Sequence, residues 1–133
     1  MKIILFILGC IIYAEGNSLN LIKIHSSLDG KLQSAFIYKA SKPNRPLIVS
    51  LHEWSGTYTG RDKLAQLAID NDINYIYPNF RGANNKKEAC CSKKVISDID
   101  DSISYMLKYA MVDKNNITIT GVSGGYGNIV HVF

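Results

Sequence analysis

The chain of 133 residues lacks the patterns that mark several functional classes. Its three cysteines and three histidines form no CxxC pair and no metal-site spacing, so we expect neither a metal nor another cofactor. The net charge of +4 is mild, and the lysines that cluster in the polar loop over 86–94 have no interleaved aromatics. This argues against nucleic acid as a partner. The chain has no internal repeat, and its 47% hydrophobic residues are ordinary for a globular domain.

The longest apolar run is too short to span a membrane. It covers Ile3–Tyr13, follows the single basic residue Lys2 and ends before Ala14-Glu15-Gly16, in which Ala14 and Gly16 are small. A membrane span needs about 20 apolar residues. The pattern predicts a cleaved secretory signal peptide over residues 1–16, and hence a secreted or periplasmic protein without a stable membrane anchor. Residues 17–133 then form one domain.

The rest of the chain alternates between strand-like and helix-like segments. An antiparallel hairpin is expected where Asp29-Gly30 separates two β-like runs, and further strands alternate with two helices. Alternation of this kind predicts an α/β fold with a mostly parallel sheet and helices on both faces, in three layers. The expected strands are Leu19–His25, Ala35–Lys39, Pro46–His52, Ile73–Tyr77 and Asn116–Thr120, and the helices are Arg61–Asp70 and 96–110.

The second helix has the clearer amphipathic pattern. Its apolar positions fall on one face at helical spacing, with Met106 beside them as core filler and Asp98 and Asp101 elsewhere. The expected buried face consists of Ile96, Ile99, Ile103, Leu107 and Ala110.

Gly121-Val122-Ser123-Gly124-Gly125 is the most informative motif of the sequence. It follows the last expected strand, and a strand, a Gly-x-Ser-x-Gly turn and a helix together form a nucleophile elbow. The glycines leave room for the tight turn that holds the serine hydroxyl clear of the backbone. Ser123 is therefore the candidate nucleophile.

The oxyanion hole is expected to combine two backbone N–H groups. One belongs to Gly124, and we assign the other to Trp54, in the loop after an earlier strand. The alternative for Trp54 is an aromatic of the core or of a lid, with no donor role. His52, at the end of that strand, is expected to be a structural histidine that holds the loop. This role is favoured over that of the base, because the triad histidine comes last in the chain of hydrolases with such an elbow.

An ordered set of motifs resembles the secreted α/β-hydrolases of the prolyl-oligopeptidase type and their esterase and depolymerase relatives. The set covers 46–127 and includes the segments Leu-His-x-Trp-Ser-Gly (51–56), Tyr-Pro-Asn-Phe-Arg-Gly (77–82), Glu-Ala-Cys (88–90) and Gly-Val-Ser-Gly-Gly (121–125). The resemblance implies a serine hydrolase acting on a peptide or ester substrate, and leaves open which of these it is. One departure is Cys91, which stands where a glycine is more usual.

A larger departure is the missing acid and base of the triad. Gly124–Phe133 contains no Asp or Glu, and the aspartates of the 96–110 helix precede the nucleophile. His131 lies eight residues beyond Ser123, about 12 Å along a helix, which is too far for a base. We therefore expect a hydrolase domain truncated after the elbow and inactive as it stands, with its oligomeric state open. The alternative is a non-catalytic secreted binding protein derived from a hydrolase.

Overall fold

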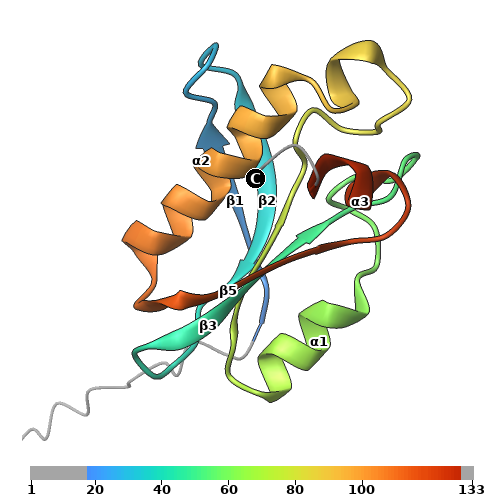
Figure 1. The fold of residues 1–133 in the computed structure, drawn as a ribbon. Coiled ribbons are helices and arrows are strands. Elements are labelled where there is room, and N and C mark those ends of the chain that lie inside the picture. Colours follow the sequence, from blue (N-terminus) through green and yellow to red (C-terminus); the bar gives the residue numbers. More distant parts are fainter. Residues whose placement is uncertain (1–17, 130–133) are drawn as a thin grey trace, which may run out of the picture.

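A computed structural model describes residues 18–129 of the chain (Figure 1). The expected signal peptide, with Cys10, and His131 lie outside the described residues. The described elements are β1 (Asn20–His25), β2 (Leu32–Tyr38), β3 (Arg45–Leu51), α1 (Lys63–Asp70), β4 (Asn74–Pro78), a short 3-10 helix (Lys87–Ala89), α2 (Lys93–Tyr109), β5 (Val112–Gly121) and α3 (Gly124–Ile129).

The described strands form one mixed sheet in the order β1-β2-β4-β3-β5. The expected hairpin is confirmed, because β1 and β2 pair antiparallel around a turn in which Gly30 has a φ of 72°. The described sheet is mixed, and the expected parallel pairing is present where β3 lies beside β4 and β5. β2 also pairs antiparallel with β4, while β3 is parallel to both β4 and β5. The local sequence pattern predicts where strands lie, but it does not predict that β2 of the hairpin pairs with β4.

Two groups of apolar side chains form the core, on opposite faces of the sheet. Side chains alternate between the faces of a strand, so Leu47 and Val49 of β3 pack in one group while Ile48 packs in the other. The first group contains the buried face of α2, and the second contains that of α1. Figure 1 shows these two helices on different sides of the strands.

The buried face of α2 differs from the expected one. Its buried residues are Val95, Asp98, Ile99, Ser102 and Met106. Met106 is core filler as expected, but Ile96 and Leu107 are only half-buried, and Asp98 belongs to the packed face rather than lying elsewhere. The reason is a buried partner, since Arg81 forms an ion pair with Asp98. A helical hydrophobicity pattern cannot reveal such a contact.

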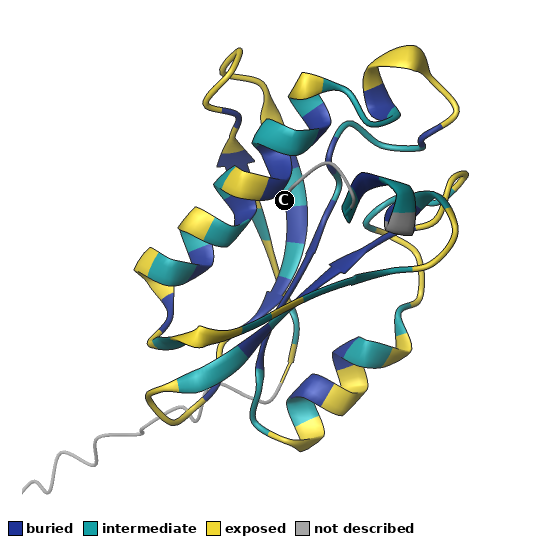
Figure 2. Cartoon of the chain, viewed as in Figure 1, coloured by how far each residue is buried: buried dark blue, intermediate teal, exposed yellow. Residues whose placement is uncertain are grey.

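The strands β3, β4 and β5 run in the same direction, so the three loops that follow them lie at the same end of the sheet. Leu51 at the end of β3 lies opposite Gly121 at the end of β5, and β4 runs alongside β3 in the same direction. The strands β3 and β4 are the most deeply buried, whereas β5 is partly exposed (Figure 2). Among the described strands, β5 lies at an edge of the sheet with β3 as its partner.

Candidate active site

Ser123 occupies the turn between β5 and α3. The strand ends at Gly121 and the helix begins at Gly124, so the strand, turn and helix that the motif requires are all present. Ser123 is exposed and has a φ of 55°. This left-handed conformation is uncommon for residues other than glycine, and strained residues of this kind cluster at functional sites. The local geometry is that of a nucleophile elbow.

The two glycines after Ser123 allow α3 to lie against the end of β3. A Cβ added to Gly125 would stand 2.5 Å from the carbonyl oxygen of Leu51 and 2.8 Å from that of His52. Both separations are far below van der Waals contact, and backbone atoms have no freedom to move aside. A side chain at this position would therefore push the elbow away from the sheet.

Trp54 and Gly124 lie next to each other, as the proposed pairing of their amides requires. A Cβ on Gly124 would stand 2.9 Å from the backbone nitrogen of Trp54. Gly124 opens α3, and the first N–H groups of a helix have no partner within it. Within residues 18–129, neither amide donates a hydrogen bond. Trp54 itself is 48% exposed, so the alternative of a core aromatic is wrong, while that of a lid aromatic stays open.

His52 is buried and lies next to the loop that carries Trp54. Its Nδ1 lies 3.0 Å from the carbonyl oxygen of Glu53, and its Nε2 lies 2.9 Å from that of Asn79. The ring stacks on Phe80 with a centroid distance of 4.0 Å and an interplanar angle of 7°. His52 thereby joins the loops that follow β3 and β4, which agrees with the expected structural role.

Asn84 is a residue of this region that the sequence analysis missed. It is 1% exposed, its backbone N–H donates to the Trp54 carbonyl at 2.6 Å, and its Nδ2 lies 3.0 Å from the Cβ position of Gly124. Its Oδ1 is buried without a hydrogen-bond partner among the described residues. Nothing in a polar Arg-Gly-Ala-Asn-Asn segment indicates that one of its asparagines is buried beside the elbow.

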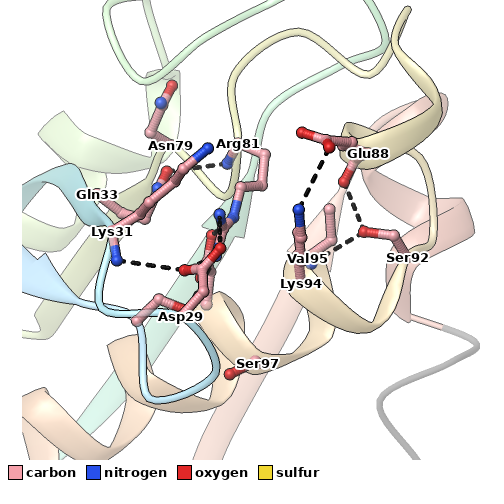
Figure 3. Close-up of polar contacts among 12 residues, drawn as sticks. Asp29, Lys31, Gln33, Asn79, Arg81, Glu88, Ser92, Lys94, Val95 and Ser97 are labelled. Atoms are coloured by element: carbon pink, nitrogen blue, oxygen red, sulfur yellow. Dashed lines mark hydrogen bonds and ion pairs between the residues drawn. The ribbon is translucent and has the colours of Figure 1, made fainter.

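Arg81, in the loop after β4, contacts the hairpin turn and α2 (Figure 3). Its guanidinium donates to Asp98 of α2 at 2.7 and 3.0 Å, to Asp29 of the hairpin turn at 2.8 and 2.9 Å, and to the hydroxyl of Ser26. The hydrogen bonds from Arg81 lower the pKa of Asp29 to about 2. In turn, the bonds to Asp29 and Asp98 raise the pKa of the guanidinium. The sequence motif marked Arg81, but only the fold reveals its partners.

Cys91 adopts a conformation that favours glycine. Its φ is 49°, and its backbone N–H donates to the buried Oδ1 of Asn128 in α3 at 3.0 Å. This explains in physical terms why a glycine fits the position better than Cys91 does. Both Cys90 and Cys91 are free thiols. Burial is the main cause that raises the pKa of the Cys91 thiol.

A cavity of about 470 Å³ opens beside the elbow, between the ends of β3 and β5 and the start of α1. Its lining includes His52, Glu53, Arg61, Tyr77 and Val122.

In the described part of the chain, no three residues of the His, Cys, Asp and Glu types come together to hold a metal ion. None of the helices within 18–129 is long and apolar enough to cross a membrane.

Comparison with known proteins finds likeness in structure alone. No family model and no curated protein sequence matches the chain. Among solved structures, the acylaminoacyl peptidase of Pyrococcus horikoshii superposes with a TM-score of 0.67 over 81% of this chain, at 22% identity. An acetyl xylan esterase from Paenibacillus sp. R4 gives 0.67 over 86% at 14% identity, and an S-formylglutathione hydrolase from Staphylococcus aureus gives 0.63 over 81% at 17% identity.

These structures are considerably longer than the chain. The match covers 19% of the peptidase and 48% of each of the other two proteins. At such identities the likeness concerns the fold, and the fold itself hosts many activities. The described part of this chain has the mixed α/β fold of these peptidase and esterase structures, an α/β-hydrolase-like fold.

Proposed function

We propose that this chain carries the nucleophile and the oxyanion site of a secreted serine hydrolase of the prolyl-oligopeptidase type. The observation that carries the proposal is the left-handed, exposed Ser123 between β5 and α3, next to the adjacent amides of Gly124 and Trp54. Two of the solved structures with this fold are a peptidase and an esterase by name, and we extend a peptide or ester substrate to this protein.

In the proposed reaction, Ser123 Oγ attacks the carbonyl carbon of the substrate. The carbonyl oxygen becomes an oxyanion, which the N–H groups of Gly124 and Trp54 stabilise by hydrogen bonds. Collapse of the tetrahedral intermediate expels the amine or alcohol and leaves an acyl group on Ser123, which water then removes. Proton transfer needs a base within about 3 Å of Oγ.

We propose that this base and its acid partner come from chain segments beyond residue 133, which also complete the three-layer domain. Residues 1–133 alone would then have negligible activity, because loss of the triad leaves only the residual catalysis of binding and the oxyanion hole. Secretion is a further part of the proposal, and a mature N-terminus at Asn17, read by mass spectrometry of the exported protein, would support it.

The test is covalent labelling of the full-length protein with a fluorophosphonate, which reacts with activated serines. We expect one adduct, located at Ser123 by peptide mass spectrometry and lost in Ser123→Ala. Ser55→Ala is the matched control, since Ser55 is an exposed serine in the loop next to Trp54. A folded protein without an adduct at Ser123 would refute the proposal.

A further inference from the structure

His52 makes two contacts that its ordinary neutral form cannot make together. Both of its ring nitrogens lie within hydrogen-bond distance of backbone carbonyl oxygens, Glu53 O at 3.0 Å and Asn79 O at 2.9 Å. A carbonyl oxygen only accepts hydrogen bonds, and a neutral imidazole carries a single N–H. If the His52 ring carried one N–H, its other nitrogen would direct a lone pair at the lone pairs of the carbonyl oxygen that it faces. His52 is 1% exposed, so water cannot relieve such a contact.

The surroundings of the ring suit a cation. Phe80 stacks on it at 4.0 Å with nearly parallel planes, and an aromatic face attracts a positive charge. From β4, the titratable side chain of Tyr77 approaches the ring edge-on, with a centroid distance of 6.4 Å. The adjacent Glu53 side chain is exposed, and no ion pair to His52 occurs among the described residues. Two carbonyl dipoles and one aromatic face therefore surround the imidazole.

The bond to Glu53 acts on a peptide group of the proposed site. The Glu53 carbonyl and the Trp54 N–H belong to the same planar peptide unit, so a hydrogen bond to the carbonyl fixes the direction of the N–H. It also polarises the unit, since linked hydrogen bonds strengthen one another. On the other side, the Trp54 carbonyl accepts from the Asn84 N–H at 2.6 Å, which holds the next peptide.

We propose that His52 is a positioning residue of the oxyanion site, protonated on both ring nitrogens, which donates to the Glu53 and Asn79 carbonyls and thereby aims the Trp54 N–H. The proposal rests on the proposed function of Trp54 and Ser123. It assigns His52 no contact with substrate, because its two protons are engaged by backbone oxygens.

The first test needs no substitution. A long-range ¹H–¹⁵N spectrum of the full-length protein at pH 7 is expected to show both ring nitrogens of His52 bonded to slowly exchanging protons. Contacts between these protons and the Phe80 ring assign the signals. One nitrogen with the resonance of an unprotonated imidazole would overturn the proposal.

The second test measures the effect on Ser123. In His52→Gln we expect the rate constant of fluorophosphonate labelling to fall about 10-fold to 100-fold. This fall is no larger than the one that follows removal of a whole oxyanion donor. The affinity for the probe before reaction should be unchanged. His25→Gln is the matched control, because His25 bonds one carbonyl, that of Gly30, at the exposed hairpin. We expect it to label at the wild-type rate.

The outcomes separate the two proposals. A folded His52→Gln that labels at the wild-type rate would overturn the positioning role, and an equal loss of affinity and rate would indicate general structural damage and overturn it too. If wild-type protein is not labelled at Ser123, the proposed function fails, while the spectrum still decides the protonation of His52. If His52→Gln does not fold, the wild-type spectrum decides by itself.

Discussion

The backbone nitrogen of Trp54 lies 2.9 Å from the point where a Cβ on Gly124 would stand, and the Cα of Trp54 is equally close. The loop after β3 and the first turn of α3 are therefore in direct backbone contact. A residue with any side chain at position 124 would separate the two amides that we assign to the oxyanion hole.

Gly124→Ala is expected to slow the labelling of Ser123 and to lower stability. The added methyl group must displace the Trp54 backbone, and forcing an extra group into a packed site costs about 1 to 3 kcal/mol. We expect a drop of that size in the free energy of unfolding, measured with urea, together with a reduced fluorophosphonate rate constant.

Gly127→Ala serves as the control for that substitution, because it lies in the same short helix. The nearest atom to its Cβ position is the Cys91 sulfur at 3.9 Å, an ordinary van der Waals contact. Alanine also favours a helix over glycine by about 1 kcal/mol. Equal losses in Gly124→Ala and Gly127→Ala would contradict the close contact between Gly124 and the Trp54 backbone.

Ser123→Gly is expected to abolish labelling and to stabilise the protein. A left-handed conformation costs a residue with a side chain about 1 kcal/mol, whereas glycine adopts it freely. The unfolding midpoint should therefore rise in Ser123→Gly but not in Ser123→Ala. A midpoint that falls equally in both variants would show that Ser123 is not strained.

Cys91→Gly is expected to raise stability for the same backbone reason, by about 1 kcal/mol. The hydrogen bond from the backbone N–H of residue 91 to Asn128 does not depend on the side chain and is retained. Cys90→Gly is the control, since Cys90 has no positive φ and gains nothing. Thermal unfolding of both variants under reducing conditions checks this prediction.

Arg81→Met is expected to destabilise the fold strongly. Asp98 has no exposed side-chain area and would be left buried without its partner, a loss of about 3 to 5 kcal/mol. Urea unfolding measures the effect. Lys94→Met is the control, because its ion pair with Glu88 is exposed and contributes no more than about 1 kcal/mol. Similar losses in the two variants would contradict the burial of the Arg81 pair.

Asp29 is expected to titrate with a midpoint near 2 in the folded protein, against 3.8 for a free carboxyl, because Arg81 donates to it. Since folding lowers this pKa, the ionised carboxylate stabilises the fold above pH 3.8, and that contribution is lost as the pH falls from 3.8 toward 2. Carbon NMR of the carboxyl group follows the titration. In Asp98→Asn, which leaves the Arg81 contact to Asp29 intact, the midpoint should stay low.

The order of strands and helices followed from local patterns in the sequence. Alternating apolar residues, the Asp29-Gly30 turn and the glycines around Ser123 are short-range features, so they identified the hairpin, the strands and the elbow. Loops 52–56 and 79–82 and Ser123 each follow one of the parallel strands, and parallel strands end together at the same end of the sheet. The contacts of His52 with Asn79 and of Gly124 with Trp54 confirm that convergence.

The tertiary structure alone decided which polar groups are buried and what they contact. Asp98 turns toward the core because Arg81, 17 residues earlier, is there to pair with it, and Asn84 is buried because α3 and the Trp54 loop close over it. The antiparallel pairing of β2 with β4 is likewise a long-range choice. Such contacts join residues distant in the chain, and a pattern that reports only on neighbours within a few turns carries no information about them.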